Sequence, residues 1–254
     1  MRLIKYILFD IIRNKILLLY TLLLFAISMG IFSFDANATK SLLSLMNIVL
    51  IVVPLVSIIF TTIYYYNAYE FTQLILAQPV KRTHLFLCQF SGVSIALVAS
   101  ELIGFGIPVI IYAPSVTGFL LIGVATALTL TFVSLALLGS VFTADKSKGI
   151  GISIILWFYF VFIYDALILG ILFAFSDYPI EHLMMTLSFL NPVDLARIGL
   201  LMQLDNAAIM GYTGAIFNQM LGATGGIISC IVVLLAWIVI PLLLSIRKFT
   251  KKDI

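Results

Sequence analysis

Six long apolar stretches dominate this sequence and restrict it to very few folds. Each stretch is long enough to cross a hydrocarbon layer of about 30 Å as a helix. A continuous apolar run in a bilayer satisfies its backbone hydrogen bonds by closing into such a helix, so the sequence predicts an all-α, polytopic membrane protein. The expected spans are Ile16–Phe34, Leu42–Tyr65, Phe86–Tyr112, Gly118–Phe142, Gly149–Phe175 and Gly225–Ile246.

The balance of residue types agrees with a place in the membrane. Of the 254 residues, 63% are hydrophobic and 10% are charged, whereas a soluble domain carries roughly 25% charged residues. So few polar residues would not cover the surface of a soluble globule. We therefore expect a single membrane domain over residues 1–254, with an N-terminal helix at 1–15, a loop at 66–85 and an outer segment at 176–224.

The basic residues predict how the chain is oriented in the membrane. When the chain is threaded through the six spans, only Lys40 and Arg197 fall on one side, and the other twelve of the fourteen lysines and arginines fall on the opposite side. Basic residues favour the cytoplasmic side. Both termini and the loop at 66–85 are therefore expected to be cytoplasmic.

The first fifteen residues predict an amphipathic helix that lies on the inner leaflet. Its basic residues favour the face opposite the apolar one. The alternative is that this segment is a ragged extension of the first span. The apolar face would hold Leu3, Ile4, Ile7, Leu8, Ile11 and Ile12.

The loop between the second and third spans is longer than a simple turn requires. It contains Glu70, a short apolar run with a helical pattern, Pro79 and the basic pair Lys81–Arg82. A helix held between two spans would pass a movement on the cytoplasmic side to both of them. The loop therefore predicts a docking element, and the alternative is an interfacial helix that touches only lipid.

The sequence carries no recognisable catalytic motif. A phosphate-binding GxxxxGK[ST] loop, HExxH and GxSxG are all absent from it. His84 and His182 are expected on opposite sides of the membrane, and Cys88 and Cys230 are isolated, as is typical of packing residues. The chain is expected not to be an enzyme and to bind no cofactor itself.

Two carboxylates fall within the expected spans, where an ionised group is costly unless it is paired or faces water. Asp165 is expected in the outer half of the fifth span, and Arg197 is the one arginine on the outer side. An ion pair between them would pin the outer segment to the bundle; alternatively, Asp165 binds a cation or proton during transport. Glu101 has no evident partner, and both a neutral structural role and a transport role stay open.

Three methionines of the outer segment are weak candidates for a metal site. Thioethers suit Cu(I), and His182 lies beside the first pair. The spacing does not repeat, so adaptable apolar contact explains these side chains equally well. The candidates are Met184, Met185 and Met202.

Taken together, these features resemble ABC-2-type permeases, also called the type V ABC transporter fold. The resemblance rests on the amphipathic helix, the six spans, the helical loop and the long outer segment. Within the loop, a glutamate precedes a leucine-rich helix, a proline and a basic residue. These are Glu70, Leu74, Leu76, Pro79 and Arg82.

Further short motifs resemble the permeases that serve maturation of the copper enzyme nitrous oxide reductase. One motif is Asn191-Pro192-x-Asp194-x-x-Arg197, preceded by Trp157 and Asp165 in the fifth span. Another is Asp10-x-x-Arg13-Asn14-Lys15 near the start. Glu101 matches nothing in the family pattern.

The resemblance implies a homodimer in the bacterial inner membrane, with a cytoplasmic ATPase that holds ATP and Mg and a periplasmic β-helical protein. Copper or a sulfur species would be the cargo. The alternatives are an exporter of lipid, peptide or drug, a protein that relays motion without moving cargo and, least favoured, a secondary carrier. The residues expected to contact the ATPase are Glu70, Gln73, Leu74, Ile75, Leu76, Pro79 and Arg82.

Overall fold

The fold is seen in a computed structural model that describes residues 7–8, 10–11, 13–34, 37–175, 178, 181–203 and 207–251. The side chains at 207–215, 218 and 223 are not among those described. Throughout the described ranges the regular elements are helices and no strand occurs. The predicted all-α class is confirmed.

Six helical stretches in the described part are long and apolar enough to span a membrane, as predicted. The third and fifth spans each contain a π-helical turn. The spans are α2 (Lys15–Phe34), α3 (Ala38–Asn67), α5–η1–α6 (Arg82–Glu101, Leu102–Gly106, Ile107–Tyr112), α7 (Val116–Phe142), α8–η2–α9 (Lys146–Phe158, Tyr159–Ile163, Tyr164–Ala174) and Thr224–Lys251 of α12 (Ala207–Lys251).

The predicted boundaries were too short at the ends that carry basic residues. The third span starts at Arg82 rather than Phe86, the fifth starts at Lys146 rather than Gly149, and the sixth runs to Lys251 rather than Ile246. Lysine and arginine are good helix formers that keep their charged ends in water while the helix continues. Hydropathy alone therefore ends these helices too early.

Near the N-terminus, some of the described side chains are buried against the protein and others are exposed. Ile7 and Ile11 are buried, whereas Asp10 and Arg13 are exposed. Ile7 packs on Gly92 of α5, where an added Cβ would lie 2.3 Å from Ile7 Cγ2. The apolar face expected to meet lipid is thus at least partly covered by α5. The rest of the predicted helix at 1–6, 9 and 12 lies outside the described residues.

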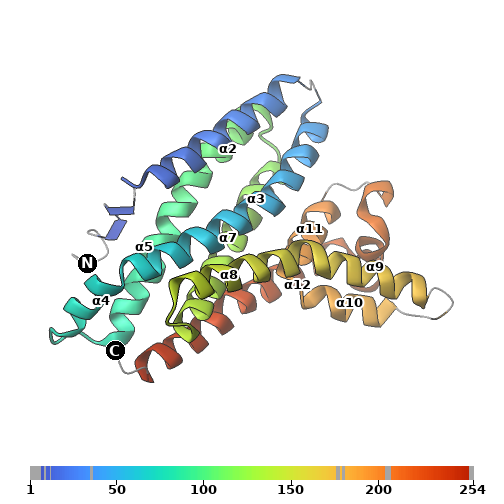
Figure 1. Cartoon of the computed structure of the whole chain (residues 1–254). Coiled ribbons are helices and arrows are strands. Elements are labelled where there is room, and N and C mark those ends of the chain that lie inside the picture. Colours follow the sequence, from blue (N-terminus) through green and yellow to red (C-terminus); the bar gives the residue numbers. More distant parts are fainter. Residues whose placement is uncertain are drawn as a thin grey trace.

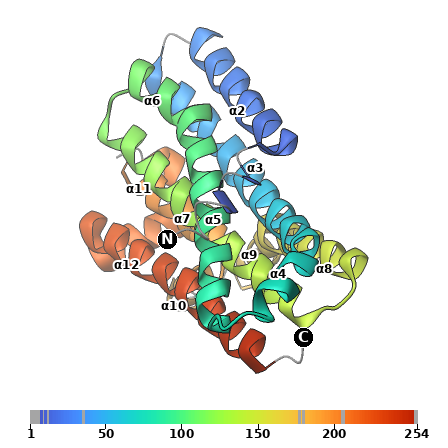
Figure 2. The same ribbon diagram turned by 90° about the vertical axis from the view of Figure 1, so that its left-hand side faces the viewer.

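α7 is the most buried span and forms the centre of the bundle. It packs against α3, α5, α12 and α11 (Pro192–Met202). Figure 2 shows α2 and α12 at opposite edges, with α5 and α7 between them. The buried hydroxyls of Thr131 and Ser134 on α7 donate to carbonyls one turn back in the same helix, so these two groups are satisfied within the core.

One end of the bundle, which we call the basic end, brings together α4 (Tyr69–Leu76), the α7–α8 turn and the last turn of α12 (Figure 1). Lys146 Nζ donates to Asn67 Oδ1 over 2.8 Å. Arg82 Nη1 donates to the carbonyl of Thr250 over 3.4 Å. The predicted order of six membrane crossings requires these loops and the end of α12 to lie on the same side of the membrane.

The opposite end holds α10 (Glu181–Phe189), α11 and the first part of α12 (Figure 1). Gly222 interrupts α12 with a φ of +69°, which favours glycine. A Cβ on Gly226 would lie 3.9 Å from the carbonyl oxygen of Phe217, although nine residues of straight helix span about 13 Å. The chain therefore bends sharply at Gly222 before the sixth span, and the described part of the outer segment contains the short helices α10 and α11.

Candidate functional site

The helix α4 presents two distinct faces at the basic end. Thr72 and Ile75 are buried, and Thr72 Oγ1 accepts a hydrogen bond of 2.7 Å from Gln89 Nε2 of α5. The opposite face exposes Glu70, Gln73 and Leu74. α4 is thus fixed to the third span on one side and exposed over much of the other.

This arrangement changes the expected set of anchor residues. Leu74 is 70% exposed, as an anchor requires, but Ile75 is 9% exposed and faces the bundle. Phe71, which the sequence argument missed, is 37% exposed. The i, i+3 spacing of Phe71 and Leu74 places them on one face, and that spacing was the available signal.

The remaining loop residues follow the helix rather than extend it. α4 ends at Leu76, which is partly buried, and Pro79 lies exposed in the turn that follows. Arg82 starts α5 and contacts the backbone of α12 at Thr250. Its guanidinium therefore helps to join the sixth span to the loop, in addition to any contact with a partner.

The expected ion pair of the outer segment is present. Arg197 Nη2 of α11 lies 2.8 Å from Asp165 Oδ2 of α9, and the two side chains are 34% and 27% exposed, respectively. The pair ties the second half of the fifth span to α11. Partial exposure means that the protein encloses neither charged group completely, and Arg197 lies outside the six spans.

The motif that begins at Asn191 fixes the start of α11. Asn191 is fully buried; its Oδ1 accepts from Val193 N at 3.0 Å, and its Nδ2 donates to the Phe160 carbonyl at 2.9 Å. Pro192 occupies the first turn, where it leaves no helical hydrogen bond unmade. Asn191 therefore caps α11 and also docks it on the π turn η2.

Asp194 is the buried acid of this region. Its side chain is 6% exposed, and burial raises its pKa to about 6, while nearby Ser188 and Arg197 act in the opposite direction. Asp194 Oδ2 and Ser188 Oγ are both buried without a partner of hydrogen-bond geometry among the described residues. Among the described acids of the outer segment, Asp194 is the one with a buried oxygen that lacks a partner.

Glu101 has the partners that the sequence did not reveal. It is 1% exposed at the end of α5, directly before η1. Oε1 accepts from the hydroxyl of Thr129 on α7 and, at 3.5 Å, from that of Tyr20 on α2. Oε2 has no partner among the described residues. The carboxyl group thus joins three spans.

The candidate metal ligands are placed as packing residues. Met184 and Met202 are each 1% exposed and lie in separate apolar clusters, and Met185 is partly buried. Among the described residues no group of three or more His, Cys, Asp or Glu side chains is placed to hold a metal. Cys88 and Cys230 are free and buried. This placement favours apolar contact for the methionines.

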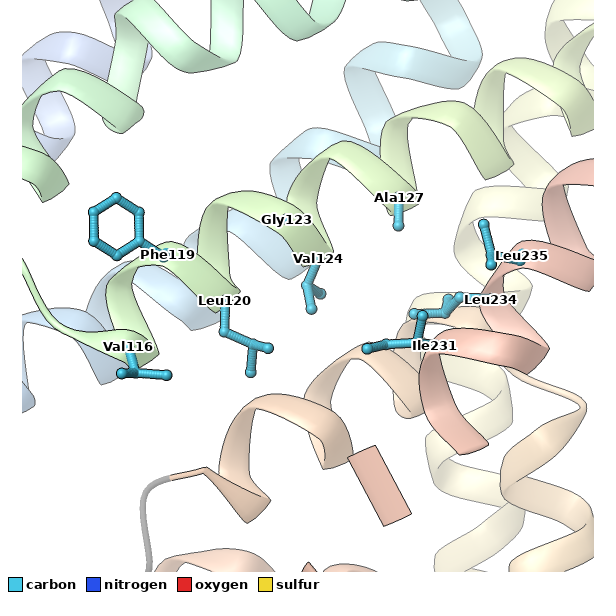
Figure 3. Close-up of a pocket in the computed structure, with 9 residues that line it drawn as sticks. All are labelled: Val116, Phe119, Leu120, Gly123, Val124, Ala127, Ile231, Leu234 and Leu235. Atoms are coloured by element: carbon cyan, nitrogen blue, oxygen red, sulfur yellow. The ribbon is translucent and has the colours of Figure 1, made fainter. Parts of the chain in front are cut away.

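A groove of about 530 Å³ runs between α7 and α12. Figure 3 shows Leu120 and Val124 of α7 and Ile231 of α12 pointing into the space between the two helices. Every lining residue is apolar or glycine, so the groove offers no group that would hold a charged cargo. The lining residues are Val116, Phe119, Leu120, Gly123, Val124, Ala127, Ile231, Leu234 and Leu235.

Fold and site together define a multi-pass helical membrane protein with a short, partly exposed helix, α4, at one end. Residues 72–254 match the family described as ABC-2 family transporter protein. The chain belongs to this family, and it is the permease subunit of an ABC transporter. Such a permease implies a partner ATPase.

Two relatives cover most of the chain. It is 30% identical over 227 residues to the probable ABC transporter permease protein NosY of Pseudomonas aeruginosa. The matched region covers 80% of this chain and 81% of that protein. It is 28% identical to the probable ABC transporter permease protein NosY of Stutzerimonas stutzeri, over 96% of this chain and 95% of the relative.

Proposed function

We propose that this chain is the permease of a transporter that serves copper-site maturation of nitrous oxide reductase. In this proposal two copies form a dimer in the bacterial inner membrane, with the basic end in the cytoplasm. A NosF-like ATPase supplies ATP hydrolysis, and a NosD-like β-helical protein docks on the outer segment. The relatives named NosY support the assignment.

The single observation that carries the coupling role is the outward face of α4. Phe71 and Leu74 are apolar side chains left exposed at the basic end, with Glu70 beside them. An amphipathic helix binds a partner by laying such a face into a groove. Because Thr72 is bonded to Gln89 on the other side of α4, a push on α4 would be passed to the third span.

The coupling role is tested by association with the partner ATPase. Leu74→Asp should weaken co-purification of the ATPase by at least about tenfold, as expected for a central apolar anchor, and Glu70→Lys should abolish it. Gln78→Asp is the matched control, because Gln78 is exposed in the same loop but lies beyond α4. Equal association of Leu74→Asp and Gln78→Asp would contradict the proposal.

The copper role is tested separately from ATPase docking. Cells that lack this chain should make nitrous oxide reductase with reduced copper content, and the chain should restore it. Replacing Met184, Met185 and Met202 together by leucine asks whether thioethers are needed. Lost copper loading with normal expression would point to sulfur ligands; full loading would leave these methionines as packing residues.

A relay of motion without cargo is the second candidate, because the outer segment is joined to the fifth span. The contact Asp165–Arg197 and the docking of Asn191 on η2 would carry a span movement into α11. Purified transporter in vesicles distinguishes the two roles. ATP-dependent uptake or release of copper or a sulfur species would support transport, and stable partner binding with no flux would support the relay.

A further inference from the structure

The ion pair at the outer end has a second acid next to it, on the same helix as the arginine. Asp194 precedes Arg197 by three residues on α11, and side chains at this spacing are neighbours. Asp165 reaches Arg197 from α9 at 2.8 Å. One guanidinium therefore pairs with a carboxyl group on a membrane span and has a second carboxyl group about one turn away on its own helix.

The two carboxyl groups have different surroundings. Asp165 is 27% exposed and already holds Arg197, whereas Asp194 is 6% exposed and its Oδ2 has no partner among the described residues. Ser188, which is fully buried, also leaves its hydroxyl oxygen unpartnered beside Asp194. Asp194 can thus stay neutral in place, but once ionised it needs a cation.

The groups that face Asp194 leave one source of positive charge. From α9 these groups are Asp165 and Tyr164, whose hydroxyl already donates to the Leu187 carbonyl at 2.7 Å. From α12 the group is Cys230, and on α11 itself it is Arg197. Among these described groups, Arg197 is the one that could compensate an ionised Asp194.

We propose that Asp194 is a proton-binding site that decides which acid holds Arg197. With the proton bound, Arg197 pairs with Asp165 and ties α9 to α11. When the proton leaves to the outer aqueous phase, Arg197 turns to Asp194 and releases α9. The partly exposed Arg197, on a helix outside the six spans, provides the path to water.

The energetics agree with a change near neutral pH. Burial raises the pKa of Asp194 to about 6, and the charge of Asp165 acts in the same direction. The second half of the fifth span would therefore be held more firmly on the acidic side of this value. The switch belongs to this chain alone, so its test requires no ATPase and fails or succeeds independently of the docking role of α4.

The test measures the α9–α11 separation in the full chain, purified in lipid nanodiscs. Spin labels are placed at Leu169→Cys on α9 and Leu190→Cys before α11, both of which are 54% exposed. Cys88 and Cys230 are 1% and 2% exposed, so they are poor targets for the label. Pulsed electron resonance then gives the distance distribution between about pH 5 and about pH 8, on either side of the pKa of Asp194.

We expect the distribution to shift to longer distances with a midpoint at about pH 6. Asp194→Asn should keep the short-distance form at every pH, and Asp165→Asn should keep the long-distance form. Glu181→Gln, which removes an exposed acid of the same segment, should behave as the wild type does. An unchanged distribution in the wild type, or a shift that survives in Asp194→Asn, overturns the proposal.

A second readout guards against a variant that does not fold. Infrared difference spectra recorded between the same two pH values should show, in the wild-type chain, loss of the carbonyl band of a protonated, buried carboxylic acid that the spectra of Asp194→Asn lack. The band should follow the same midpoint as the distance change. If carboxyl titration and distance change have different midpoints, Asp194 does not control the separation.

Discussion

The ring of Tyr66 at the end of α3 lies directly on the bare backbone of Gly149 at the start of α8. A Cβ added to Gly149 would lie 2.3 Å from Tyr66 Oη. The same hydroxyl donates to the Thr143 carbonyl at 3.2 Å. The second span is therefore seated on the α7–α8 turn by one aromatic side chain, and this seating depends on a missing methyl group.

We expect Gly149→Ala to displace Tyr66 and to destabilise the folded chain by about 1–3 kcal/mol, as overpacking typically does. Thermal unfolding in detergent measures the change. Gly151→Ala is the control, because an added Cβ meets nothing within 4 Å there. Equal melting temperatures for the two variants would show that Tyr66 can move aside without loss.

Replacing Thr129 should weaken the junction of three spans. Thr129→Val keeps the shape of the side chain but removes the hydroxyl that donates to Glu101. A buried carboxyl group that loses a donor costs about 1–3 kcal/mol, so the free energy of unfolding in a denaturing detergent titration should fall by that amount.

The control is Thr126→Val one turn away, since the Thr126 hydroxyl donates to Ile122 of its own helix. This variant should be nearly neutral. A loss no larger for Thr129→Val than for Thr126→Val would mean that Glu101 draws little stabilisation from α7.

Asp194→Asn should change how stability depends on pH. The folded chain raises the pKa of Asp194 from 3.8 to about 6, so folding favours the protonated form. The stabilisation is complete below about pH 4 and is lost as the pH rises through about 6. Asparagine stays neutral at every pH. At pH 8 the free energy of unfolding of the variant should therefore exceed that of the wild type by roughly 3 kcal/mol.

Thermal unfolding at about pH 5 and about pH 8, on either side of the raised pKa, checks this expectation. Glu181→Gln, an exposed acid in the first turn of α10, should leave the pH dependence as it is. A wild-type chain that is more stable than Asp194→Asn at the higher pH would show that the ionised carboxylate is well compensated.

Asn191→Ala should be the most damaging of the cap substitutions. The side chain caps α11 and also donates to Phe160 of η2, so its loss leaves buried backbone groups without partners. We expect a cost of about 2–3 kcal/mol, measured by unfolding. Asn37→Ala, at the exposed start of α3, should cost about 1 kcal/mol.

The placement of the spans could be predicted because it depends on local composition. Long apolar runs indicate membrane helices wherever they occur, and the basic residues indicate which loops share one side of the membrane. The pair Asp165–Arg197 was predictable by elimination, since the expected outer side offered one arginine. These inferences needed no knowledge of which helices touch.

The contacts between helices could not be predicted in the same way. Tyr20, Glu101 and Thr129 lie on three different spans, and a hydroxyl in an apolar run usually bonds its own helix, as Thr126 does. Which face of α4 is buried depends on Gln89 of the next span. Such features require the angles and depths at which helices cross, which periodicity does not determine.

The π turn η2 sets the rotational phase of the second half of the fifth span. Each added residue turns the rest of a helix by about 100°, and a π turn accommodates one such residue inside an α-helix. Asp165 is the second residue after η2, in the first turn of α9. Deleting one residue from Tyr159–Ile163 would leave the span long and apolar enough to cross the membrane but would turn Asp165 away from Arg197. A deletion that hardly alters the hydropathy of the span would therefore remove the ion pair between the span and α11.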